Sequence, residues 1–326
     1  MKRRAFLALA AAAGAAPRVL AQAKGVPRIG YLLLTPEVEP PSRERQAFLD
    51  ALRAHGYAPG KNVEILYRSA EGEPEFMDEV AREMVAAKVD VIVGSGSQPI
   101  LSAMRATRSI PVVMLAVGDP VGIGAVQSIA RPGANVTGVS FISSDLAPKR
   151  MQLLRELLPR ARSVAVLWDT QNANASEEVV AAQAAARGLG MTPLPYPVAR
   201  DGELDDILAR IGAQRPDALY VAFEGRLVAG NRHALAQFGL RQRMPVISGW
   251  SRVTEAGGLL SYAADIPAMF ARGAAFVHRI LSGERPERMA IELPTRVELV
   301  INRTTAKALG IKLPNALLVR SDRVIE

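Results

Sequence analysis

Two short polar turns in the first half of the chain carry the residues best suited to ligand chemistry. The first turn, Gly94-Ser95-Gly96-Ser97-Gln98, offers hydroxyl groups and backbone N–H groups at the start of a predicted helix. Such a helix start can hold a carboxylate, because its N–H groups have no partner within the helix and its dipole is positive there. The second turn contains Asp119, an acid with no basic neighbour in the sequence, which can accept hydrogen bonds from an ammonium group. Together the two turns predict a site for a zwitterion.

Both turns also have a simpler interpretation. Ser95 and Ser97 could cap the helix that begins near Pro99, and caps of this kind need no ligand. Asp119-Pro120 could form an Asx-type turn, in which the carboxylate binds its own backbone. We favour ligand binding for Asp119, because it follows a buried strand and ligands of open α/β sheets bind at such strand ends.

The chain lacks the residue patterns of familiar catalytic and metal sites. It has no cysteine and three histidines, His55, His233 and His278, which lie on unrelated predicted helices. Neither a zinc site nor a Ser–His–acid triad is expected from this set. The Gly-Ser turn also fails the nucleophile-elbow, Walker and dinucleotide-binding patterns. We therefore expect a protein that is not an enzyme and that has no catalytic residue, metal or cofactor.

A second group of candidates follows the strands predicted in the second half of the chain. Trp168, Phe223 and Trp250 could stack on a ligand, although an isolated aromatic residue at a strand end more often packs between lobes. Asn172 and Glu224 lie close behind two of these strands. Glu224 could bind a ligand or cap the next helix, and the sequence leaves both roles open.

Parallel strands are needed to position these turns. Val89–Val93 and Pro111–Val117 are short apolar runs rich in β-branched residues, which is typical of strands buried on both faces. Between them, Ile100–Thr107 has the composition of a short helix. Strand and helix patterns alternate from Pro27, and the alternation begins again near Ser163. The pattern predicts an α/β fold with two doubly wound, parallel-sheet lobes.

The first 21 residues are predicted to be an export signal. Basic residues at positions 2–4 precede an apolar segment over 5–16, and Val19-Leu20-Ala21 is a small-residue cleavage site. The apolar segment is too short to span a bilayer, and Arg3-Arg4 leaves both Sec and twin-arginine export open. We expect a periplasmic protein. No cysteine is available for a lipid anchor.

The net charge and the absence of cysteine fit the expectation of a periplasmic protein. The 326-residue chain has a net charge of +8, of which the basic residues of the signal, at positions 2, 3, 4 and 18, supply four. The remaining excess is ordinary for a solvated surface, so no nucleic acid partner is expected. The absence of cysteine from an exported chain favours a bacterial periplasmic domain with a large core.

A series of motifs runs nearly from end to end of the chain. They are Gly30-Tyr31 with the helix over 43–56, Val89–Gly94, Val117-Gly118-Asp119-Pro120-Val121, 130–140 (ARPGANVTGVS), 164–168 (VAVLW), 255–262 (EAGGLLSY), 298–302 (ELVIN) and 305–310 (TAKALG). In this order they resemble the exported substrate-binding proteins of ABC importers, in the family that includes tryptophan- and tyrosine-type binding proteins. The combination is far more specific than any single motif.

The resemblance implies a type I periplasmic-binding-protein fold, in which three crossing strands join two lobes that trap a ligand. The crossings would fall near 137–141, 256–262 and 292–299. The implied division is a signal peptide over 1–21, an N-terminal lobe over 24–139 and 262–292, and a C-terminal lobe over 140–261 and 293–326.

The resemblance also implies which loops hold the ligand. Carried over position by position, the ligand-binding residues would be Thr35, Ser95, Gly96, Ser97, Gln98, Asp119, Phe141, Asn172, Glu224 and Trp250. Asp169-Thr170 departs from the Asn-Pro pair often seen after the tryptophan in relatives, which puts that part of the site in doubt.

The expected function is capture of a small molecule between the lobes and its delivery to the membrane permease of an ABC importer. An amino acid is the expected ligand and a monomer the expected state. Two alternatives stay open: a ligand-sensing receptor for a membrane signalling partner, and an exported α/β enzyme.

Overall fold

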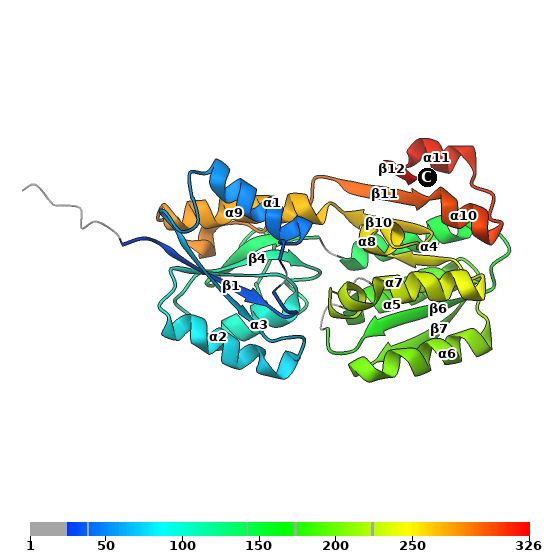
Figure 1. Ribbon diagram of the computed structural model, residues 1–326, viewed down its shortest axis with the longest axis horizontal. Coiled ribbons are helices and arrows are strands. Elements are labelled where there is room, and N and C mark those ends of the chain that lie inside the picture. The colour runs from blue at the N-terminus through cyan, green and yellow to red at the C-terminus, as the bar shows by residue number, and fades with distance from the viewer. Residues whose placement is uncertain (1–24, 38, 142, 173–174, 223–224) are drawn as a thin grey trace, which may run out of the picture.

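The computed structural model describes residues 25–37, 39–141, 143–172, 175–222 and 225–326, which form two α/β lobes lying end to end (Figure 1). The N-terminal lobe contains β1 (Arg28–Leu33), α1 (Arg43–Ala54), β2 (Glu64–Ser69), α2 (Met77–Ala86), β3 (Val91–Gly94), α3 (Ser97–Ala106), β4 (Val112–Val117), β5 (Val136–Ser140) and α9 (Ile266–Leu281). The C-terminal lobe contains α4 (Ser143–Leu157), β6 (Ser163–Asp169), α5 (Ala175–Gly188), β7 (Thr192–Val198), α6 (Leu204–Gln214), β8 (Leu219–Val221), α7 (Gly225–Gln242), β9 (Val246–Ser248), α8 (Ser251–Glu255), β10 (Leu260–Ala264), β11 (Val297–Asn302), α10 (Arg303–Leu309), α11 (Asn315–Arg320) and β12 (Arg323–Ile325). Short 3-10 turns lie at Pro74–Phe76, Asp201–Glu203 and Pro286–Arg288.

Each lobe is built on one predominantly parallel sheet. The N-terminal sheet has the strand order β2-β1-β3-β4-β5, and all of its pairings are parallel. The C-terminal sheet has the order β12-β11-β10-β9-β8-β6-β7, and β11 runs antiparallel to β10. The predicted fold class, two doubly wound α/β lobes, is confirmed.

Strand alternation explains why helices cover both faces of the N-terminal sheet. In β4, Val113 and Leu115 join the apolar cluster that includes residues of α1 and α9. Val112 and Met114 point the other way, into the cluster formed with α2 and α3. Because successive side chains of a strand point to opposite faces, a run without polar residues requires a helical layer on each side. Figure 1 shows α1 and α9 on one side of this sheet and α2 and α3 on the other.

The chain crosses between the lobes three times. It leaves β5 of the N-terminal sheet for α4, returns from β10 to α9, and passes from the region of Glu292 to β11. Near the third crossing, Glu292 pairs with Val139 beside β5, where its N–H donates to Gly138 O at 3.0 Å. The lobe boundaries expected at 139/140 and 261/262 fall inside the strands β5 and β10. The sequences of these two strands alone do not show which lobe each strand joins.

Helix α3 begins earlier than the sequence predicted. The expected helix covered Ile100–Thr107, whereas α3 covers Ser97–Ala106 and includes Pro99 in its first turn. Proline is tolerated there, because the first N–H groups of a helix have no intrahelical partner. The first turn of α3 therefore extends into the polar segment that follows β3.

Candidate ligand-binding site

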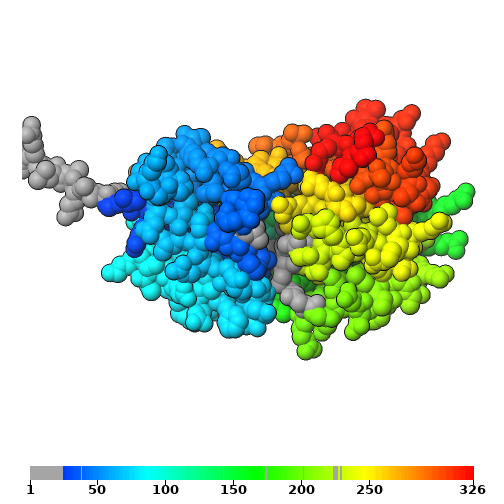
Figure 2. All heavy atoms as spheres, viewed as in Figure 1, coloured from blue at the N-terminus to red at the C-terminus, as the bar shows by residue number. Residues whose placement is uncertain are grey.

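A cavity of about 820 Å³ lies between the lobes, at the carboxyl ends of β1, β3 and β4. Figure 2 shows the blue N-terminal lobe closely apposed to the yellow part of the C-terminal lobe. Residues from both lobes line the cavity, including those that follow β1, β3, β4, β5, β6 and β9. This is the crevice that parallel α/β sheets provide for ligands.

Most of the predicted ligand-binding residues lie on the wall of this one cavity. Those that line it are Thr35, Ser95, Gly96, Ser97, Gln98, Phe141, Asn172 and Trp250. They come from positions as far apart in the sequence as 35 and 250, and the two sheets bring them together. Glu224 lies outside the described residues, so its predicted role stays a prediction.

The turn after β3 contacts the other lobe directly. Gly96, with φ of +84°, precedes the first residue of α3, and no side chain caps the helix there. The Ser97 hydroxyl instead donates to Oδ1 of Asn172 at 2.9 Å. Gln98 Nε2 donates to the backbone oxygen of Gln171 at 2.7 Å. The capping alternative for Ser97 is therefore wrong, and the turn joins the lobes beside the cavity.

One part of the cavity wall is apolar. Phe141, Trp250, Ile266 and Phe270 line it, and all four are buried. Trp250 is 8% exposed, and the guanidinium of Arg252 lies 5.4 Å from its ring centroid. Large apolar side chains with a few polar groups are typical of small-molecule sites.

A buried ionic cluster forms another part of the wall. Glu178 and Ser143 line the cavity, and Arg150 and Tyr220 lie behind them, fully buried. Arg150 Nη1 donates to Glu178 Oε1 at 2.8 Å, and the hydroxyls of Tyr220 and Ser143 also donate to this carboxylate. Arg150 Nε donates to the backbone oxygen of Tyr262 at 2.8 Å.

The cluster holds an ion pair beside a neutral phenol. Burial raises the pKa of Tyr220 well above its usual range, and the Glu178 carboxylate raises it further against the opposing effect of Arg150. Burial alone would lower the pKa of Arg150, but its partners Tyr220 and Glu178 raise it. Arg150 is therefore charged and Tyr220 is a neutral hydrogen-bond donor.

Asp119 forms the Asx-type turn that was predicted as the alternative to ligand binding. Its Oδ1 accepts hydrogen bonds from the backbone N–H groups of Val121, at 3.1 Å, and Gly122, at 2.9 Å. These bonds form an Asx-type turn. Asp119 is not among the described residues that line the cavity, although the preceding Gly118 is. The predicted contact of Asp119 with a ligand therefore stays a prediction.

Trp168 also lies apart from the cavity. It is half-buried near the end of β6 and packs against the apolar cluster that contains residues of α4 and α5. Its packing is within the C-terminal lobe, and not between the lobes as the sequence alternative for strand-end aromatics proposed. Phe223 lies outside the described residues.

Sequence reasoning missed the buried cluster, although a signal for it exists. Arg150 lies three residues after Ala147 and four before Leu154, so it occupies the apolar face of α4. Glu178 lies four residues before Ala182 on the corresponding face of α5. A charged residue of each sign on the buried faces of consecutive helices indicates an internal ion pair.

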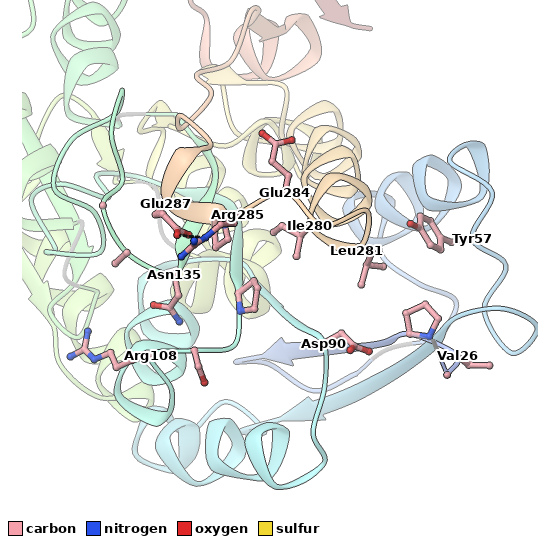
Figure 3. A pocket seen from close by; sticks show the side chains of 18 of the residues that line it. Val26, Tyr57, Asp90, Arg108, Asn135, Ile280, Leu281, Glu284, Arg285 and Glu287 are labelled. Atoms are coloured by element: carbon pink, nitrogen blue, oxygen red, sulfur yellow. Dashed lines mark ion pairs between the residues drawn. The ribbon is translucent and has the colours of Figure 1, made fainter. Parts of the chain in front are cut away.

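A second cavity, of about 1130 Å³, lies in the N-terminal lobe at the opposite ends of its strands. Its wall includes Asp90 and Asn135, which precede β3 and β5, and the segment that follows α9 (Figure 3). Arg285 and Glu287 form an ion pair of 2.6 Å at its edge. None of the predicted ligand-binding residues that the structure describes lines this cavity.

Among the described residues, no group of three or more His, Cys, Asp or Glu side chains is placed to hold a metal ion. No helix in the same part of the chain is both long and apolar enough to cross a membrane.

Comparison with known proteins identifies the family. A tyrosine-binding protein of Clostridioides difficile (strain R20291) is 25% identical over 291 residues, which is 87% of this chain and 83% of that protein. A Streptococcus pneumoniae ABC domain in complex with L-Trp has a TM-score of 0.85 at 24% identity, and the match covers 92% of this chain and 99% of that one. A ligand-free, open substrate-binding protein with adhesive properties from Clostridium difficile has a TM-score of 0.66 at 26% identity, with the same coverage. Residues 35–325 match the family described as ABC transporter substrate binding protein, and the chain belongs to this family.

Proposed function

We propose that this protein is an exported, periplasmic receptor that captures an amino acid between its lobes and delivers it to the membrane permease of an ABC importer. The observation that carries the proposal is the cavity of about 820 Å³, which both lobes line and where Ser97 of one lobe hydrogen-bonds to Asn172 of the other. A cavity of this size suits one small molecule.

The lining favours a ligand with a polar head and an apolar side chain. Ser95 to Gln98 place the start of α3 at the cavity, where a carboxylate is favoured by the helix dipole and unpaired N–H groups. Phe141, Trp250 and Phe270 supply an apolar wall. The tyrosine-binding protein and the L-Trp complex found by comparison support the same ligand class.

Ligand capture would stabilise the closed arrangement of the lobes. A molecule that contacts both walls binds the closed state better than the open state, so it shifts the equilibrium toward closure. The TM-score of 0.85 with the L-Trp complex, against 0.66 with the ligand-free, open protein, supports a closed arrangement here. The closed surface is then what the permease would recognise.

A thermal-shift screen tests the proposal. The protein lacking residues 1–21 is screened against amino acids, nucleosides, sugars and organic acids. A ligand present at a hundred times its dissociation constant stabilises the folded state by about 2.7 kcal/mol, which raises the midpoint of unfolding clearly. We expect stabilisation by aromatic or other apolar amino acids. Stabilisation by sugars or nucleosides alone would contradict the proposed ligand class, and chemical turnover of a bound ligand would favour an enzyme.

A further inference from the structure

We infer that Glu178, with Ser143 beside it, is the subsite that binds a primary ammonium group of the ligand. This assignment rests on the proposed capture of a small solute in the interlobe cavity. In this assignment, the charged hydrogen-bond acceptor for the ligand belongs to the C-terminal lobe.

The carboxylate of Glu178 is held in one orientation at the cavity wall. Its side chain is 1% exposed and accepts hydrogen bonds from Arg150, Tyr220 and Ser143. Ser143 and Glu178 line the cavity, whereas Arg150 and Tyr220 do not. The hydroxyl of Ser143 donates to Glu178, and its oxygen accepts a long hydrogen bond of 3.4 Å from Arg150 Nη1. A hydroxyl oxygen has two lone pairs, so the second can accept an N–H from a ligand.

The local order of charges favours a cation beside Glu178, whereas Arg43, Arg45, Arg232 and Arg252 line other parts of the cavity. Arg150 lies behind Glu178 as seen from the cavity, so the negative end of the ion pair faces the ligand. Burial weakens screening by water, which strengthens the attraction between this carboxylate and an ammonium group. Glu178 is also in the first turn of α5, where the helix dipole stabilises a negative charge.

Among the described residues, Glu44 is the other buried acid on the cavity wall, and its surroundings are different. Its carboxylate lies 3.3 Å from Nε of Arg252, and Arg252 itself lines the cavity. A cation therefore already stands on the cavity side of Glu44. Of the two acids, Glu178 is the one whose negative charge faces the ligand.

The proposed subsite lies close to the carboxylate site. Ser97, the first residue of α3, hydrogen-bonds to Asn172, which lies three residues before α5 begins. Glu178 is the fourth residue of α5. The ammonium and carboxylate groups of an α-amino acid are attached to the same carbon, so their subsites must be neighbours. This hydrogen bond holds the first turn of α3 beside the segment that leads into α5, and Ser97, Asn172 and Glu178 all line the same cavity.

The cluster is costly for a purely structural feature. A buried ion pair often stabilises a fold no better than apolar side chains of similar size. Among the described residues, Nη2 of Arg150 is buried and has no hydrogen-bond partner, which adds a desolvation cost. Recognition of a charged ligand group explains this costly arrangement, which packing alone does not explain.

The test compares amino acids with their deamino analogues by isothermal titration calorimetry. The probes are L-tryptophan with indole-3-propionate, and L-tyrosine with 3-(4-hydroxyphenyl)propionate, which differ in the ammonium group alone. We expect the protein to bind the amino acid roughly 10- to 100-fold more tightly, as is typical of a charged hydrogen bond to a buried partner. Equal affinity for both members of each pair overturns the subsite and leaves solute capture standing.

Variants then assign the preference to Glu178. Arg150→Met/Glu178→Gln removes both charges together, because Glu178→Gln alone leaves Arg150 buried without a counter-charge. We expect the preference for the ammonium group to fall below about threefold while the deamino acid binds as before. A folded double variant that keeps the wild-type preference overturns the assignment. Glu177→Gln, the same substitution at the exposed neighbouring position of α5, is the matched control and should keep the full preference.

Ser143→Ala gives a second reading if the double variant does not fold. It leaves the ion pair intact and removes one acceptor, so the preference should fall by about three- to tenfold. An unchanged preference in this variant counts against the subsite. If no member of either pair binds the wild-type protein, the aromatic amino-acid ligand of the proposed function fails, and the subsite fails with it.

Discussion

At the scale of single residues, Asp119 shows how one carboxylate can serve either a ligand or its own backbone. Its sequence position, directly after a buried strand, favoured the ligand. The structure instead directs Oδ1 to the N–H groups of Val121 and Gly122, and the residue is not among those lining the cavity. Position at a strand end therefore does not by itself place a side chain in the crevice, since the following turn can use the same oxygen.

Asp119→Asn separates the two roles. Asparagine keeps the Oδ1 acceptor of the Asx turn but removes the charge. We expect ligand affinity to change by less than about twofold and stability to remain near that of the wild type. Asp119→Ala should lose about 1 kcal/mol of stability, because two turn hydrogen bonds are removed. A tenfold loss of affinity in the asparagine variant, measured by calorimetry, would instead show that the charge contacts the ligand.

At the scale of elements, β5 depends on a glycine that no other residue can replace without strain. Gly138 has φ of +132°, and a Cβ there would lie 2.2 Å from the backbone oxygen of Met114 in β4. The register between β4 and β5 shifts between Met114 and Val117, next to this contact. The strand leads to the first interlobe crossing, so its pairing also fixes where Phe141 lies.

Gly138→Ala should therefore destabilise the protein by about 2 to 4 kcal/mol, through backbone strain and the forced separation of β4 and β5. The matched control is Gly188→Ala at the end of α5, where a Cβ meets nothing within 4 Å. That change should be neutral or stabilise the fold by up to about 1 kcal/mol, since alanine favours helix. Urea denaturation followed by circular dichroism measures both. Equal midpoints for the two variants would show that the strands can move apart cheaply.

Elements were easier to predict than their contacts. The alternation of apolar runs with polar turns predicted the two parallel-sheet lobes, because period and composition are local properties. It did not predict the short strand β12 near the end of the chain. The partners of Glu178 lie 28 and 42 residues away in the sequence, at Arg150 and Tyr220. Helical periodicity places Arg150 and Glu178 on buried faces, but it does not identify Tyr220 as a third partner. The start of α3 differs from the prediction for another reason, since proline can occupy the first turn of a helix as well as precede it.

At the scale of the whole molecule, the lobes meet through polar contacts beside the cavity. Ser97 and Asn172 come from opposite lobes and form a buried hydrogen bond, and Arg43 forms an ion pair of 3.3 Å with Glu255 in the other lobe. The sequence suggested that two sets of strand-end residues face each other. It could not show that a serine from one set bonds to an asparagine from the other, because that depends on how far the lobes close.

This interlobe hydrogen bond makes closure measurable. A double-mutant cycle measures ligand affinity in Ser97→Ala, in Asn172→Ala and in the double variant. The contacts of each residue with the ligand cancel in this cycle, and the interaction between the two residues remains. We expect a coupling of about 0.5 to 1.5 kcal/mol, since the bond forms when the lobes close on the ligand. Small-angle scattering should show a smaller radius of gyration with ligand than without it. Additive effects on affinity, together with an unchanged radius, would mean that the lobes do not open and close and that ligand enters a pre-closed cavity.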